Sequence, residues 1–168
     1  MDVISYEFFK ASKTAPLFES SLNEFIPRGA NYMTLWKIKD DAHYSSSGIN
    51  NLLMLGSDTM TDYTLTVDVR IDKDMGNARA GVIVRLNNPS IMTHQVDECA
   101  QGYFIGFNNM QLVMQRIDYG GFVVAAETDS YELGTYHELK VIAKGNMISV
   151  YFDGEFKFSY VDPYPFHH

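Results

Sequence analysis

The chain has 168 residues, of which 46% are hydrophobic and 20% are charged, a balance that is typical of one soluble domain with a real core. The formal net charge is −8 and the thirteen Lys and Arg residues form no basic tract, so the surface would repel a phosphate backbone, which argues against nucleic acid as a partner. No run approaches the roughly 20 apolar residues of a membrane helix. The first residues lack the basic-then-apolar order of a signal peptide, and the lone Cys99 excludes an internal disulfide.

The first 61 residues carry weak patterns. They predict a strand over residues 32–38, a Ser/Gly loop and a short apolar strand over residues 51–55. Residues 17–25 are compatible with a helix of about two turns. No other helix is expected.

From Asp62 onward, short segments with alternating apolar and polar residues are separated by turn residues, which indicates an antiparallel all-β domain. In DYTLTVDVRID, one face carries Tyr63, Leu65, Val67, Val69 and Ile71. Further strands are expected within residues 80–88, 101–109, 108–118, 122–128, 136–144 and 146–162. The turns Gly145-Asn146 and Asp153-Gly154 make the last three strands a meander. About ten to twelve strands favour a two-sheet antiparallel jelly-roll β-sandwich over a barrel.

The order of several motifs resembles that of the concanavalin A-like (laminin G-like) jelly-roll modules of bacterial glycoside hydrolases, particularly the fructan-binding type on levanases. The motifs are W-x-I-x-D from Trp36, G-V-I-V-R followed by Q-G-Y, and the hairpin H-x-L-K-V-x-A-x-G-N-x-I-x-V-Y-x-D-G, and the match covers about residues 17–166. The resemblance implies a non-catalytic, lectin-like carbohydrate-binding sandwich. It also implies an extracellular or cell-surface setting, with a catalytic domain in the same parent chain and a plant or microbial glycan as ligand.

The end of the chain departs from that pattern. Such modules continue after D-P-Y-P-F with a glycine and a closing strand of the G-x-I-G-L type, whereas this sequence ends at His168. We expect a single domain over residues 1–168 that either lacks its closing strand or is completed by residues 3–12. In the second case, the N-terminal strand is integral to the fold.

Arg85 stands in the apolar strand AGVIVRLNN, on the same face as Gly81. Two interpretations are open: an exposed charge that pairs with a carboxylate such as Asp68, or a ligand arginine, whose rigid guanidinium can bridge two adjacent sugar hydroxyls. The resemblance implies the second, because the arginine at the end of this strand belongs to the ligand site. Asp68 and Arg70 share a face of the preceding strand, where Asp68 could orient Arg85 and accept from a sugar hydroxyl.

Three further residues are candidate sugar contacts. Glu98 and Gln101 lie in the polar loop before the strand that follows, at a strand end where binding sites are often built. Trp36, the single tryptophan, either stacks on a sugar or packs under the sheet. Tyr103 is expected in the core instead.

A calcium site is a separate hypothesis. Asp72, Asp74 and Asn77 fall in one turn and offer the oxygen ligands that a hard cation takes, although the same residues also make an ordinary hairpin turn. No cofactor is expected.

Two other function classes stay open. A glycoside hydrolase of the same sandwich fold would use paired carboxylates, but no G-x-S-x-G or H-E-x-x-H motif is present and the five histidines form no metal pattern. A structural domain that braces a catalytic neighbour would need neither a ligand arginine nor a carboxylate pair, and it predicts a large apolar surface patch.

Overall fold

The computed structural model describes residues 4–7, 26–28, 36–39, 42–45, 52–54, 60–72, 79–87, 100–108, 111–127 and 131–166. These residues form thirteen strands and no helix. The strands are β1 (Ile4–Glu7), β2 (Ile26–Arg28), β3 (Trp36–Lys39), β4 (Ala42–Ser45), β5 (Leu52–Met54), β6 (Tyr63–Ile71), β7 (Arg79–Asn87), β8 (Gln101–Asn108), β9 (Gln111–Asp118), β10 (Gly121–Glu127), β11 (His137–Lys144), β12 (Met147–Phe152) and β13 (Glu155–Val161). Among the described residues, no helix could span a membrane.

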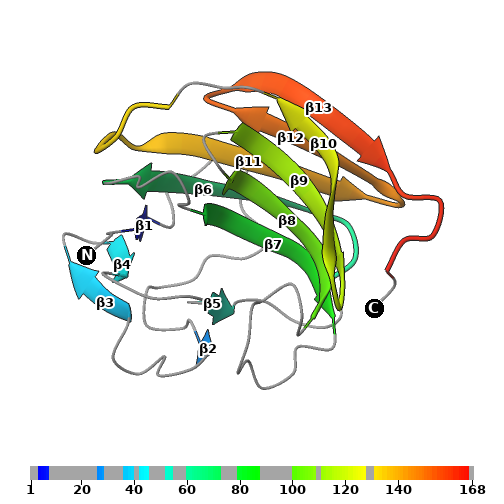
Figure 1. The fold of residues 1–168 in the computed structure, drawn as a ribbon, viewed down its shortest axis with the longest axis horizontal. Helices are drawn as coiled ribbons and strands as arrows, with labels where there is room; N and C mark the ends of the chain where they lie inside the picture. The colour runs from blue at the N-terminus through cyan, green and yellow to red at the C-terminus, as the bar shows by residue number, and fades with distance from the viewer. Residues whose placement is uncertain are drawn as a thin grey trace.

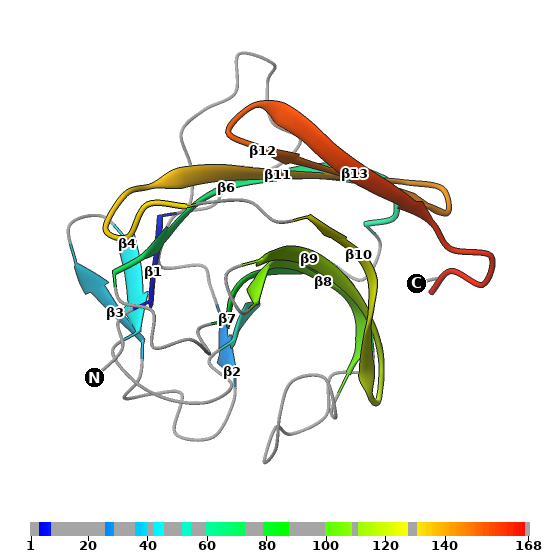
Figure 2. The ribbon, with the colours of Figure 1, turned by 45° about the horizontal axis from the view of Figure 1, so that its top comes forward.

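Two antiparallel sheets form the body of the molecule (Figure 1). One has seven strands in the order β13-β12-β11-β6-β1-β4-β3, and the other has four in the order β10-β9-β8-β7. The four-stranded sheet is strongly curved, and its convex side faces the larger sheet (Figure 2). The architecture is the predicted all-β jelly-roll sandwich.

Strand alternation explains the core between the sheets. The inward positions of β6 carry Val67, Val69 and Ile71, as the pattern of that segment predicts, and all three are buried. Strands β7, β8 and β9 of the facing sheet and strands β11 and β12 beside β6 contribute apolar side chains at every second position. The core residues from these strands are Ala80, Val82, Val84, Tyr103, Ile105, Phe107, Leu112, Met114, Leu139, Val141, Ile148, Val150 and Phe152.

The concave face of the four-stranded sheet is apolar as well. Ile83 packs there against a second buried cluster made of Phe104, Val113 and Ile117. Beside them, Gly81 lies opposite Gly106 in the β7-β8 register. Their backbones approach so closely that a Cβ on Gly81 would stand 2.1 Å from the carbonyl oxygen of Ile105.

The C-terminal meander is confirmed, with β12 between β11 and β13. Its second turn has Asp153 at φ 48° and Gly154 at φ 80°, the left-handed pair that a tight two-residue hairpin requires. Gly145 in the first turn also has a left-handed φ of 55°.

The described N-terminal strands overlap the predicted ones. The strand expected over residues 32–38 is observed as Trp36–Lys39 and that over residues 51–55 as Leu52–Met54, whereas β2 and β4 were not predicted. The expected helix over residues 17–25 lies outside the described residues. β1 pairs with β6 on one side and β4 on the other, so this N-terminal strand has an interior position in the larger sheet.

Candidate functional site

The end of β7 carries a β-bulge at Arg85. The β7-β8 register runs from Val84 opposite Tyr103 to Asn87 opposite Gln101, so two residues of β7 face one residue of β8. Arg85 takes a left-handed φ of 52°, which is uncommon for a residue with a side chain. Such bulges bend a strand and redirect a side chain. Here the redirection brings Arg85 to the first residues of β6, in the opposite sheet.

Residues Thr61, Asp62, Tyr63 and Arg85 form what we call the Arg85 site. The Arg85 backbone N–H donates to the Tyr63 hydroxyl at 2.7 Å. Its guanidinium Nη2 lies 3.5 Å from the Thr61 carbonyl oxygen and 3.8 Å from Asp62 Oδ1. The side chain of Arg85 is only 5% exposed, whereas that of Asp62 is 55% exposed.

The positive charge of the Arg85 guanidinium is balanced only weakly by the nearby Asp62 carboxylate. Asp62 Oδ1 is already engaged, since it accepts from the Gly145 backbone N–H at 2.8 Å, and it stands at the long end of ion-pair distances from Arg85. Burial raises the pKa of Tyr63, and the Arg85 N–H and charge offset part of that rise, so Tyr63 stays a neutral hydroxyl. A nearly buried cation is costly unless an anion, a polar ligand or water meets its donors.

Asp68 and Arg70 do not join this site. Asp68 lies between the buried residues Val67 and Val69, so it points to the outer face of the seven-stranded sheet, away from Arg85. Arg70 shares that outer face, with its Nε 2.7 Å from Asp72 Oδ1 and its guanidinium over the Tyr136 ring. The expectation that Asp68 orients Arg85 is therefore corrected, because Asp62 is the carboxylate that the structure places beside the guanidinium.

The other residues that the sequence analysis singled out do not belong to the Arg85 site. The Gln101 amide donates to Asp118 Oδ1 at 2.7 Å, at the same end of the sheet as Arg85. Trp36 begins the edge strand β3, where the structure describes the backbone alone. Glu98, Asp74 and Asn77 lie outside the described residues. Asp72 pairs with Arg70, and no group of three metal-ligating side chains occurs within the described ranges.

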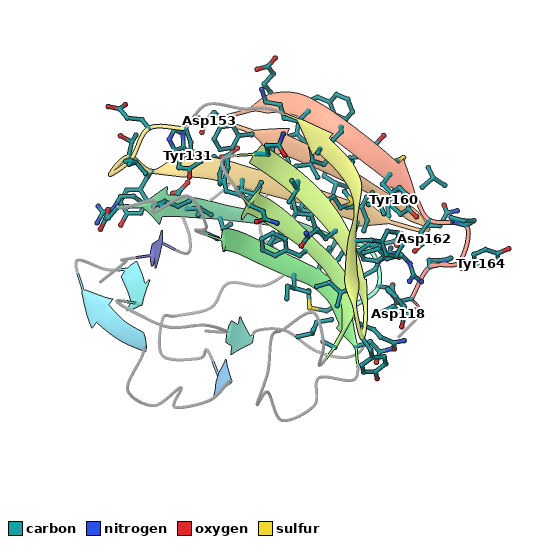
Figure 3. The ribbon with its side chains drawn as sticks, in the orientation of Figure 1. Asp118, Tyr131, Asp153, Tyr160, Asp162 and Tyr164 are labelled. Atoms are coloured by element: carbon teal, nitrogen blue, oxygen red, sulfur yellow. The ribbon has the colours of Figure 1, made fainter. Side chains whose placement is uncertain are left out.

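A second polar group closes the sandwich at this end, and the sequence analysis missed it. We call Tyr103, Arg116, Asp162 and the chain through Tyr164 to Phe166 the C-terminal cluster. The carboxylate of Asp162 accepts from the Tyr103 hydroxyl, from Arg116 Nε at 2.8 Å and from the Tyr164 backbone N–H at 2.8 Å. Figure 3 shows Asp162, Tyr164 and Asp118 gathered there, opposite the end with Tyr131 and Asp153.

The pKa of Asp162 reflects these contacts. Burial would raise it, but the hydrogen bonds from Tyr103, Arg116 and Tyr164 together hold it below its usual value, so Asp162 is a buried carboxylate anion. Burial and the bond to Asp162 raise the pKa of Tyr103, which keeps its hydroxyl protonated as a donor. The only sequence signal for the C-terminal cluster was the D-P-Y-P-F motif, and this motif does not indicate which residues Asp162 contacts.

Comparison with known proteins assigns the chain to a protein family and finds a solved structure of similar fold. The profile of the 3-keto-alpha-glucoside-1,2-lyase-like domain matches residues 13–168, and the chain belongs to that family. In fold it is similar to the carbohydrate-binding module CBM66 from Bacillus subtilis, with a TM-score of 0.63 and 15% sequence identity over 83% of this chain and 80% of that one. Among curated protein sequences, none matches.

Proposed function

We propose that this chain is a non-catalytic carbohydrate-binding module that holds a sugar through Arg85. The observation that carries the proposal is the Arg85 guanidinium itself, which is 5% exposed, is redirected by the β-bulge and lies 3.8 Å from the nearest carboxylate oxygen that the structure describes. The likeness in fold to a carbohydrate-binding module supports it. The setting that goes with it is an extracellular protein with a glycan-degrading domain in the same parent chain, in which β1 completes a single sandwich domain.

The chemistry follows from the shape of the guanidinium. The guanidinium is a rigid plane, and its Nε–Nη2 edge or its Nη1–Nη2 edge can donate to two adjacent hydroxyl oxygens of a sugar ring. Asp62 Oδ1 balances the charge from 3.8 Å, beyond hydrogen-bond distance of Nη2. Gln101, Glu98 and Trp36 stay predicted further contacts, and a calcium ion at Asp72, Asp74 and Asn77 stays a separate hypothesis. Few fixed groups and costly desolvation of hydroxyls predict an affinity in the micromolar to millimolar range, on the order of 4–8 kcal/mol.

A lyase is the second candidate, and the family match favours it. An elimination next to a keto group needs a base that removes a proton and a donor that stabilises the oxyanion. Arg85 could supply the donor, and Asp62 is the carboxylate beside it. A lyase would release a new unsaturated product from a 3-keto-glucoside, whereas a binding module returns its ligand unchanged.

The first test compares wild type with Arg85→Ala on affinity gels and by calorimetry against levan, arabinan, xylan and their simple sugars. We expect binding by the wild type and at least a tenfold loss in Arg85→Ala, because the bidentate donor is gone. Arg85→Lys should lose binding as well, since it keeps the charge without the planar fork.

The matched control is Arg70→Ala, which removes an arginine on the outer face of the seven-stranded sheet. It should bind as the wild type does. Thermal melts must show both alanine variants folded. Unchanged binding in a folded Arg85→Ala protein, or no glycan bound by the wild type, would refute the proposal. Product formation from a 3-keto-glucoside would replace it with the lyase.

A further inference from the structure

The D-P-Y-P-F segment after β13 holds Tyr164 on a fixed backbone. Prolines at 163 and 165 flank it, and each restricts its own φ to about −65°. The Tyr164 N–H donates to Asp162 Oδ1 at 2.8 Å, and its carbonyl oxygen accepts from Arg116 Nη2 at 3.1 Å. Phe166 then packs on Arg116, whose guanidinium carbon lies 4.0 Å from the ring centroid. The backbone on both sides of Tyr164 is therefore anchored to the sandwich.

The Tyr164 side chain, in contrast, is 81% exposed and points away from the ribbon (Figure 3). On the other side of Arg116, its cross-strand neighbour Phe122 on β10 is 54% exposed. The core does not use either ring. An aromatic side chain with two rotatable bonds on a fixed backbone loses little conformational entropy when it binds a partner.

Planar polar groups adjoin Arg116, the residue that contacts the Tyr164 backbone and lies opposite Phe122. Asp118 accepts from Arg116 Nη1 at 3.2 Å and from Gln101 Nε2 at 2.7 Å, and its carboxylate is partly exposed. Exposed rings beside a carboxylate and an amide suit a ligand with apolar C–H faces and hydroxyl edges. That is the surface chemistry of a sugar, since a ring covers the C–H face while the polar groups meet the hydroxyls.

The strand register connects this surface to the Arg85 site. Gln101 lies opposite Asn87, just past the bulge of Arg85, and also opposite Asp118 on the next strand. Strands are about 4.8 Å apart, so the backbone of Phe122 on β10 is three strand spacings, about 15 Å, from that of Arg85 on β7, and Arg116, which contacts the Tyr164 carbonyl, is two spacings away on β9. A short saccharide chain can span that distance, whereas one sugar ring cannot contact both ends.

We propose that Tyr164 and Phe122 form a second contact surface, which binds the inner units of a saccharide chain whose terminal sugar is held by Arg85. The ligand is then an oligosaccharide or polysaccharide end, and its affinity depends on chain length. The inference rests on the proposed function for the class of ligand, but it uses residues that the Arg85 site does not contain.

The test measures dissociation constants by calorimetry for saccharides of one to four units derived from levan, arabinan and xylan. Wild type should bind the longer chains more tightly than the single sugar. Tyr164→Ala should weaken binding of the longer chains roughly three- to tenfold, because one ring contact is lost, while the single-sugar constant changes less than twofold. Phe122→Ala should act in the same direction, and Tyr164→Phe should bind as the wild type does.

Phe156→Ala is the matched control, since Phe156 is 53% exposed but packs edge-on to Tyr151 in the seven-stranded sheet. It should leave every constant unchanged. Equal affinity of wild type for one and four units, or wild-type affinities in Tyr164→Ala, would overturn the inference while leaving the Arg85 proposal standing. If Arg85→Ala also loses all binding, the ligand site holds one sugar at Arg85 and no inner units. No binding by wild type would overturn both. A dimer that Tyr164→Ala converts to monomer would assign the rings to self-association instead.

Discussion

Asp162 links three parts of the chain through one carboxylate, which is 2% exposed. It accepts hydrogen bonds from Tyr103 on β8, from Arg116 on β9 and from the backbone after β13. Removing its charge would leave the Tyr103 hydroxyl without its anionic acceptor, and would leave Arg116 with the more exposed Asp118 as its remaining ion-pair partner. Removing one partner of a buried ion pair costs about 3–5 kcal/mol of stability, because the remaining charge stays buried without compensation.

We therefore expect Asp162→Asn to lower the free energy of unfolding by about 2–3 kcal/mol at pH 7, because one oxygen acceptor remains. The folded-state pKa of Asp162 is lowered, so its contribution is present above the unfolded value of about 3.9 and is lost as pH falls through the folded value. Urea denaturation between pH 2 and 7 should show the gap between wild type and Asp162→Asn closing below about pH 4.

The control for that experiment is Asp118→Asn, which neutralises a more exposed carboxylate that is also hydrogen-bonded to Arg116. It should cost less than about 1 kcal/mol, as exposed pairs do. A gap between wild type and Asp162→Asn that stays constant to pH 2 would contradict the role given to the Asp162 charge.

The sequence indicated Arg85 as a candidate ligand residue, but not the direction of its side chain. Strict alternation puts Arg85 on the face of Gly81, and the bulge breaks that alternation without a glycine at position 85 to announce it. Arg116 was not singled out because its partner Asp162 stands far along the chain. Contacts of that range depend on how the sheets pack, which a local pattern does not contain.

At the scale of the strands, Gly81 and Gly106 set how closely β7 and β8 approach. A Cβ on Gly106 would stand 2.2 Å from the Ala80 carbonyl oxygen and 2.5 Å from the Gly81 Cα. Both of these atoms belong to the backbone, so the clash cannot be relieved by a rotamer change. The strand pair must separate to admit a side chain.

Gly81→Ala should therefore lower stability by about 2–3 kcal/mol or more, at the upper end of the cost of overpacking. The matched control is Gly120→Ala in the β9-β10 turn, where a Cβ would meet no atom within 4 Å. It should stay within about 0.5 kcal/mol of wild type. Circular dichroism melts of both variants decide the point, and equal melting temperatures for the two would contradict the close approach.

The elements that the sequence predicted well share a local cause. From β6 to β13 each strand is long enough for alternation to show, and left-handed turn residues such as Gly145 and Gly154 mark the boundaries. The strands β2 and β4 have three and four residues, too few for a period of two to stand out from chance. Their pairing is decided by the partner strand rather than by their own sequence.

At the scale of the whole molecule, β1 has an interior place. Its residues pair with β6 through Ile4 opposite Ile71 and with β4 through Ile4 opposite Ser45. Without β1, both neighbours would present unpaired backbone N–H and C=O groups inside the sheet. Such exposed edges are costly and also promote association between chains.

Deletion of residues 1–7 should abolish cooperative folding, with loss of dispersed amide signals by NMR and aggregation on concentration. Ser5→Pro makes a milder test, because Ser5 lies opposite both Tyr44 and Arg70 and proline cannot donate to either neighbour. It should lower the melting temperature by several degrees. A deletion variant with the melting temperature of wild type would show that β1 is dispensable.

The order of strands in the larger sheet also has a consequence for folding during synthesis. β6 lies between β1, which leaves the ribosome first, and β11, which begins at His137. The sheet therefore cannot be assembled until most of the chain has been synthesised. Until then, the edge of β6 that pairs with β11 stays unpaired. Sheets built from such distant segments fold in milliseconds to seconds. During that interval, the nascent chain is a natural client for a chaperone that covers exposed strand edges.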